Sequence, residues 1–262
     1  MSAWPRPEGF TLVELVVSMA ITLVVMACVF LMAGPAQDVF AVQPESADVQ
    51  QRVRVTVTTL MKDLLMAGAG RPPGNACEAA VGAAVRPHRV GDVASDVAAG
   101  RHYRPDVISL VYVDAQLGPD VSELVSRTYY LKATSPDVSQ LMRYDGRVTD
   151  HPVLEDVVAL AFEYFGSPPS EPLASAADPV PLDPATLIDG PWCPDAAHPA
   201  RFDTDLLRVR RVRVRLRVQA PRAFRGPQGT LFTRGGNART NRYVPDQEIR
   251  FDVAPRNLNR DR

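Results

Sequence analysis

The sequence lacks the signatures by which most enzymes and nucleic-acid-binding proteins are recognised. It contains no HExxH, CxxC, GxSxG or Walker pattern and no phosphate-cradling glycine-rich loop. The formal net charge of the 262 residues is only −1, so the chain as a whole has no electrostatic attraction to nucleic acid. We therefore expect neither an enzymatic activity nor a cofactor.

Histidine and cysteine are also scarce. We interpret the scattered histidines as solvated side chains rather than metal ligands; they are His88, His102, His151 and His198. Asp203 and Asp205 form a weak candidate for Ca²⁺, whose ligands are oxygen atoms, and we expect no metal site. Cys28 lies in an apolar run, which leaves Cys77 and Cys193 as a possible disulfide if the globular part occupies an oxidising compartment.

What the sequence does contain is a long apolar run near its N-terminus. From Phe10 to Ala33 the only charged side chain is Glu14, and this length exceeds the roughly 20 residues that a helix needs to cross a membrane. The run is too long for a secretory signal and has no A-x-A-like cleavage site after it, so we expect a retained single-span anchor. A carboxylate at the centre of a span costs about 2.5–3.5 kcal/mol, so Glu14 needs a partner or a function. Positive charge precedes the span at Arg6 and returns only at Arg52, which favours a cytoplasmic N-terminus.

The segment that begins this run, Gly9-Phe10-Thr11-Leu12-Val13-Glu14-Leu15, resembles the processing motif of type IV pilins and of the pseudopilins of type II secretion. The resemblance implies that residues 1–9 are a leader peptide, that a prepilin peptidase cuts between Gly9 and Phe10, and that Phe10 is then N-methylated. Glu8 departs from the family, in which a basic residue is more common. The physical chemistry agrees, because cleavage would create an ammonium on Phe10 and Glu14 lies at i+4 on the same helix face. In a stack of subunits, the ammonium of one chain could meet Glu14 of its neighbour.

Beyond the span, the sequence predicts an interruption and a second helix. Gly34-Pro35 breaks the helical hydrogen-bond pattern, and Ser46-Ala47-Asp48 offers a new helix start. Gly68 and Gly70 then end the second helix. Its apolar residues recur at helical spacing and should cover a sheet; they are Val49, Val53, Val57, Leu60 and Leu64. We expect a transmembrane segment at 10–33, a kink and amphipathic helix at 34–70, and a periplasmic β-rich domain at 71–262.

Several alternating segments in that domain predict strands, with Asp145-Gly146 as a hairpin turn. A slip in the alternation at Arg210-Arg211 predicts a β-bulge. The Pro-rich stretch 167–199 has no sustained periodicity and predicts a long surface loop. The predicted strands are 106–114, 126–132, 140–144, 153–165, 207–218 and 247–253.

An arginine stripe is the best sequence indication of a function other than assembly. It alternates with apolar residues on one strand and consists of Arg208, Arg210, Arg213, Arg215 and Arg217. Such a row could contact phosphates, but no aromatic residues interleave with it, as single-strand binding would favour. The alternative is a solvated sheet face with acidic neighbours across the strands. We expect nucleic-acid binding to be unlikely.

The globular part resembles, more weakly, PilW-like minor pilins and the related J-type minor pseudopilins. The resemblance rests on Tyr129-Tyr130-Leu131, Leu141-Met142-Arg143-Tyr144, Val153-Leu154-Glu155-Asp156-Val157, Phe162-Glu163-Tyr164-Phe165, the late alternating strand and Val253-Ala254-Pro255-Arg256-Asn257-Leu258. It implies an α+β pilin-like fold in which a long N-terminal helix packs on an antiparallel β-sheet.

The function implied by the resemblance is that of a minor type IV pilin, present at low copy and at the filament tip, which helps to initiate assembly. Expected partners are the prepilin peptidase, other minor pilins and the major pilin, and the inner-membrane assembly platform. The expected location is the inner membrane, with a cytoplasmic N-terminus and a periplasmic domain, and then the pilus. The alternatives are a minor pseudopilin of type II secretion, a DNA-binding pilin for uptake, and a membrane-anchored enzyme or receptor domain that merely retains the motif.

Overall fold

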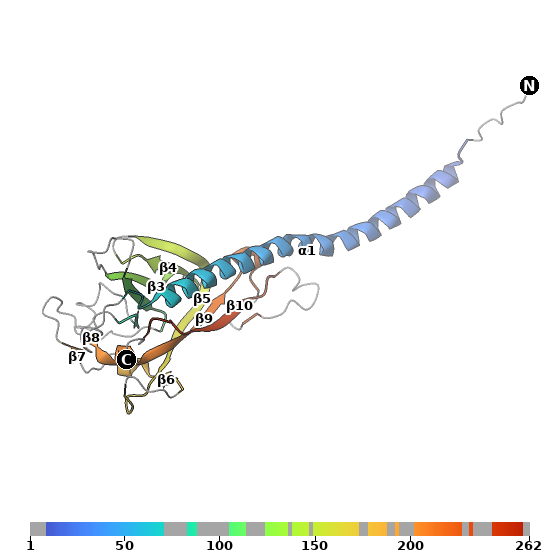
Figure 1. The fold of residues 1–262 in the computed structure, drawn as a ribbon. Coiled ribbons are helices and arrows are strands. Elements are labelled where there is room, and N and C mark those ends of the chain that lie inside the picture. Colours follow the sequence, from blue (N-terminus) through green and yellow to red (C-terminus); the bar gives the residue numbers. More distant parts are fainter. Residues whose placement is uncertain are drawn as a thin grey trace, which may run out of the picture.

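The protein folds as one long helix whose C-terminal half packs against an antiparallel sheet (Figure 1). The computed structural model describes residues 9–70, 83–87, 105–113, 124–135, 138–146, 149–172, 178–187, 192–193, 202–226, 231–232 and 243–258. The predicted α+β class, with a helix packed on an antiparallel sheet, is confirmed.

The helix α1 (Leu12–Met66) is continuous over 55 residues. The predicted interruption at Gly34-Pro35 and the second start at Ser46 were therefore wrong. Proline removes only one backbone donor, and the helical turns on either side hold the chain in register across the gap. Figure 1 shows a gentle curve along the helix, whose N-terminal half projects away from the sheet. The predicted end is confirmed, because Gly68 and Gly70 follow the last helical turn with positive φ angles of 76° and 69°.

All the predicted strands form, with ends within three residues of the expected bounds. The main sheet is antiparallel and eight-stranded, in the order β1-β2-β3-β4-β5-β9-β10, with β6 paired to the end of β5. Its strands are β1 (Val85–Arg86), β2 (Ile108–Val113), β3 (Leu124–Ser135), β4 (Val138–Tyr144), β5 (Asp150–Gly166), β6 (Val180–Leu182), β9 (Val209–Val218) and β10 (Gln247–Val253). A separate two-stranded sheet pairs β7 (Trp192–Cys193) with β8 (Phe202–Asp203), and the short 3₁₀ helices are η2 (Pro184–Leu187), η3 (Thr204–Arg208) and η4 (Arg222–Phe224).

The core lies between the C-terminal half of α1 and one face of this sheet. The predicted apolar stripe of α1 is confirmed, with Val49, Val53, Leu60 and Leu64 all buried and Val57 packed at the edge. The strands contribute the inward half of their alternating side chains: on β9, Val212, Val214, Leu216 and Val218 are buried while the arginines between them are not. Alternation on the strands and helical periodicity on α1 thus produce one shared apolar layer.

Two local predictions about the backbone are also confirmed. Gly146 has φ +84° in the β4–β5 hairpin, where a side chain would clash with Ser126. On β9, Arg211 pairs with Phe165 and Val209 with Gly166, so Arg210 is the extra residue of a bulge.

The Pro-rich stretch 167–199 is not the featureless surface loop that its composition predicted. It contains β6, η2 and β7, and it places Leu182 and Leu187 in the core. Isolated apolar residues between prolines give no periodic signal, but each still gains free energy by filling a gap in the core.

Candidate functional site

The N-terminal segment of the described chain presents an accessible peptide bond followed directly by a helix. Gly9 has no positive φ, and a side chain added there would meet nothing within 4 Å. Phe10 is 88% exposed. No packing or backbone constraint in the described structure therefore requires glycine at position 9.

Glu14 lies in the first turn of α1 and is joined to the residue that caps the helix. Its Oε2 accepts hydrogen bonds from the backbone N–H of Thr11 at 3.0 Å and from Thr11 Oγ1 at 2.9 Å. In return, Thr11 Oγ1 accepts from the backbone N–H of Glu14 at 3.3 Å. This reciprocal pair is a capping box, which satisfies two backbone donors at the helix start. The sequence signal of a capping box is the spacing Thr-x-x-Glu before an apolar run. This role of Thr11 was not predicted from the sequence.

The helix that follows Glu14 is apolar on every side and uncovered. Leu12–Ala33 is long and apolar enough to cross a membrane, and none of this segment is buried against the rest of the chain. Its polar side chains bond internally, with Ser18 Oγ donating to the carbonyl of Leu15 at 2.9 Å and Thr22 Oγ1 to that of Ser18 at 2.7 Å. An apolar surface of this extent needs lipid or another protein to cover it.

A buried polar cluster joins α1 to the sheet and was missed by the sequence analysis. Asp63 lies among the apolar residues of the helix and accepts from Tyr129 Oη at 2.7 Å and from Arg143 Nε at 2.8 Å. Burial and the Asp63 carboxylate raise the pKa of Tyr129, which keeps the hydroxyl protonated as a donor. The signal available in the sequence is a lone acid at position 63, three residues after Leu60 on an otherwise apolar face.

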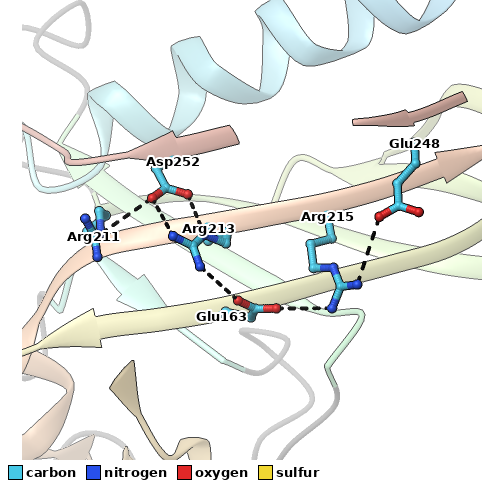
Figure 2. Close-up of polar contacts among 6 residues, drawn as sticks. All are labelled: Glu163, Arg211, Arg213, Arg215, Glu248 and Asp252. Carbon is cyan, nitrogen blue, oxygen red and sulfur yellow. Dashed lines mark hydrogen bonds and ion pairs between the residues drawn. The ribbon is translucent and has the colours of Figure 1, made fainter. Parts of the chain in front are cut away.

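The arginine stripe faces away from α1 and is paired with acids on both neighbouring strands (Figure 2). Arg213 binds Asp252 through Nε at 2.7 Å and Nη2 at 3.0 Å, and these hydrogen bonds lower the pKa of Asp252. Glu163 lies 3.7 Å from Arg213 and 3.4 Å from Arg215. The acidic neighbours expected across the sheet are therefore present.

The predicted membership of the stripe was partly wrong. The bulge at Arg210 places Arg211 in the row, where it lies 3.7 Å from Asp252 and stacks over the Phe165 ring at 4.5 Å. Arg208 belongs to η3 and points elsewhere: it donates to Asp205 at 2.7 Å and to the carbonyls of Pro168 and Glu171. A one-residue bulge moves the side chain of every residue before it on the strand to the opposite face of the sheet.

The remaining candidates form no ligand cluster in the part of the chain that the structure describes. Asp203 uses Oδ1 to cap η3 at the N–H of Asp205, while Asp205 pairs with Arg208, so both acids serve the local fold. His151 is exposed on β5, and the other histidines lie outside the described residues. Cys77 is also outside them, and for Cys193 the structure gives the backbone of β7 alone.

Comparison with known proteins bears on the N-terminal segment. Residues 4–30 match the family model of the prokaryotic N-terminal methylation motif. A comparison with curated proteins gave no match. Among solved structures, the chain is similar to a type IV-like pilin from Thermus thermophilus, at 12% identity over 80% of this chain and 97% of that chain, with a TM-score of 0.37.

The chain therefore carries a prokaryotic N-terminal methylation motif directly before an exposed apolar helix. The motif implies processing by a prepilin peptidase. The apolar helix is consistent with the membrane anchoring of pilins.

Proposed function

We propose that the chain is a minor type IV pilin, a structural subunit that enters the filament at low copy, near the tip, and helps to initiate assembly. The observation that carries the proposal is the N-terminal constellation: the methylation motif, an accessible Gly9–Phe10 bond, and an apolar span that no part of the described chain covers. The size of 262 residues, above that of a compact major subunit, supports a minor role.

The processing site follows from the same segment. Prepilin peptidase cuts between Gly9 and Phe10 on the cytoplasmic face, and Phe10 is methylated on its new amine. Glycine at position 9 is not required by the fold, so its presence is best explained by recognition in the peptidase site. The domain after the span then lies in the periplasm, and the assembly platform adds the subunit to the filament beside other minor pilins and the major pilin.

Assembly itself uses Glu14 and the apolar span. In the filament, neighbouring spans replace lipid around Leu12–Ala33, and Glu14 accepts the Phe10 ammonium of an adjacent subunit. Both hydrogen bonds recorded for the carboxylate use Oε2, so the second oxygen is available for that charge. Pairing removes two charges from hydrocarbon together, which is far less costly than leaving either alone.

Intact-mass spectrometry of the protein isolated from membranes tests the processing. We expect a chain that starts at N-methylated Phe10, and a chain that retains residues 1–9 in cells with active peptidase would refute the proposal.

Immunolabelling of sheared filaments tests the assembly. We expect sparse labelling at filament ends and fewer filaments after deletion of the gene. Normal filament number combined with a defect in protein secretion would assign the subunit to a type II secretion pseudopilus instead.

A further inference from the structure

The outer face of β5, β9 and β10 is organised as rows of residues that run across the strands. The antiparallel register places one residue of each strand side by side, and all three point away from α1. The rows are Glu163–Arg213–Asp252, Ala161–Arg215–Arg250 and Ala159–Arg217–Glu248.

The first and third rows contain their own acids. Arg213 is held by the bidentate contact with Asp252 described above, and Arg217 Nη2 donates to the buried Asp246 at 2.8 Å. Charge-assisted contacts of this length satisfy a guanidinium within the fold.

The middle row contains two guanidiniums and no acid. Arg215 reaches only diagonal neighbours, Glu163 at 3.4 Å and Glu248 at 4.0 Å (Figure 2), and its side chain is 45% exposed. Arg250 is exposed directly opposite it, and the described part of the chain records no ion pair for Arg250. The like charges of this row are therefore compensated only by acids in the two neighbouring rows.

A hollow of about 300 Å³ lies beside Arg215, where β5 contributes Leu160 and the small side chains of Ala159 and Ala161. Arg215, Arg217 and Glu248 form the other side of the hollow. Its volume corresponds to about ten water molecules at roughly 30 Å³ each, enough to admit one acidic side chain.

We propose that the Arg215–Arg250 pair, with the hollow beside Arg215, forms a docking site for a single Asp or Glu side chain on the globular domain of a neighbouring pilin-like subunit. This inference rests on the proposed function, in which such neighbours surround the chain. A carboxylate bound over this pair would meet two forked donors and compensate the charge of the middle row. The surrounding acids favour this occupant over nucleic acid, because Glu163, Glu248 and Asp252 flank the site and would repel an extended row of phosphates.

Carbodiimide cross-linking in whole cells tests the proposal, because the reagent joins an amine to a carboxylate that touches it. The sequence contains only two lysines, Lys62 and Lys132, so the background from the chain itself is low. Arg215→Lys keeps the charge and introduces an amine into the site. Arg213→Lys is the matched control, on the same strand and face but already occupied by Asp252 and Glu163.

We expect Arg215→Lys to form an amide with an Asp or Glu of another pilin-like subunit, identified by peptide mass spectrometry. Arg213→Lys should give only products within the chain, and adding Arg250→Gln to Arg215→Lys should strongly reduce the intermolecular product. Products from Arg215→Lys to Glu163 or Glu248 alone would overturn the docking site, since they show that the reagent reached it and found no partner. Salt-sensitive binding of duplex DNA by the full-length protein, lost in Arg215→Ala, would assign the site to phosphate and likewise overturn the proposal.

The outcomes separate this inference from the proposed function. A chain that is processed at Phe10 and found in filaments, without the intermolecular product, refutes the docking site alone. A chain with the product in membranes but absent from filaments refutes the filament role and leaves a carboxylate site for another membrane partner.

Discussion

Glu14 has one role in the isolated chain and a second, proposed role in the assembly. In the chain, its carboxylate completes the capping box with Thr11 at the start of α1. In the filament, the same carboxylate is proposed to neutralise the Phe10 ammonium of a neighbour. The two roles can be separated, because a neutral amide can replace a carboxylate in a capping box but cannot neutralise an ammonium.

We expect Glu14→Gln to keep the helix start and to fail in assembly. The variant should insert and be cleaved, yet leave the neighbour's ammonium unpaired at a cost of about 3–5 kcal/mol. Filament counts and immunoblots of sheared fractions measure the loss, and Glu14→Ala should behave alike. Thr11→Ala is the matched control, since it removes the cap at about 0.5–2 kcal/mol but keeps the charge. Normal incorporation of Glu14→Gln would show that the carboxylate has no such partner.

Asp63 has a different role, because its partners are within the chain. It links α1 to β3 and β4 through Tyr129 and Arg143, and it is the only acid recorded as buried on the described length of the helix. An apolar residue there would pack as well, but it would not fix which sheet residues face which turn of the helix.

Asp63→Ala should destabilise the fold by about 3 kcal/mol, because it leaves the Tyr129 hydroxyl and the Arg143 guanidinium without their acceptor. This value is at the low end of the range for buried pairs, since the Arg143 side chain is 29% exposed and can recruit water. Thermal unfolding of the detergent-solubilised protein measures the change. Asp48→Ala is the control: Asp48 pairs with Arg52 on the exposed side of the same helix, where such a pair contributes about 0.3–0.5 kcal/mol. Equal effects of the two substitutions would contradict the role assigned to Asp63.

The helix α1 carries two kinds of surface in succession. Its first half is exposed on all sides, while its second half buries one stripe against the sheet. The continuity through Gly34-Pro35 joins these halves into one helix, so the packed half determines where the apolar half points. An interruption and kink at that position, as the sequence predicted, would have changed the direction of one half relative to the other.

Truncation of the buried stripe should therefore cost far more than truncation of the opposite side. We expect Leu60→Ala to lower the free energy of unfolding by about 2–5 kcal/mol, because Leu60 is fully buried and its loss leaves a cavity. Val55→Ala removes an exposed residue and should change stability by less than about 0.5 kcal/mol. Chemical denaturation followed by circular dichroism compares the two. A small effect of Leu60→Ala would mean that the helix does not depend on this contact with the sheet.

The molecule as a whole divides into an apolar helical rod and a β-domain whose outer face carries ordered charges. The β-domain is joined to the rod by core packing rather than by a linker. In the proposed filament, any force on the apolar rod would therefore be transmitted directly to the sheet.

A disulfide between Cys77 and Cys193 remains a prediction, which depends on the proposed periplasmic location of the β-domain. The bridge would close a long loop and stabilise the domain by roughly 4–5 kcal/mol in the chain-entropy model. Alkylation of the native protein before and after reduction tests it: we expect protection of both thiols until reductant is added. Labelling of both cysteines without reductant would rule the bridge out, and Cys28, which lies in the span, serves as the internal thiol control.

The sequence predicted the structure best where a residue pattern has a single physical cause. Alternation located the strands and the bulge at Arg210-Arg211, and helical spacing located the buried stripe of α1. It was misleading at Gly34-Pro35, because local propensity does not include the stabilisation from turns on either side. It was silent about the core residues of the Pro-rich stretch, Leu182 and Leu187, which have no periodic neighbours.

The apolar run, the methylation motif and the division of each strand into an apolar and a polar face follow from the sequence alone, because these features depend on residues close together in the chain. Only the tertiary structure decided which acid meets which arginine. The register of β5, β9 and β10 brings Glu163, Arg213 and Asp252 into one row from positions far apart in the chain. It leaves Arg215 beside Arg250 with no acid in their row. Local pattern sets the face on which a side chain lies, but strand register sets its neighbours, and register results from the packing of the whole sheet.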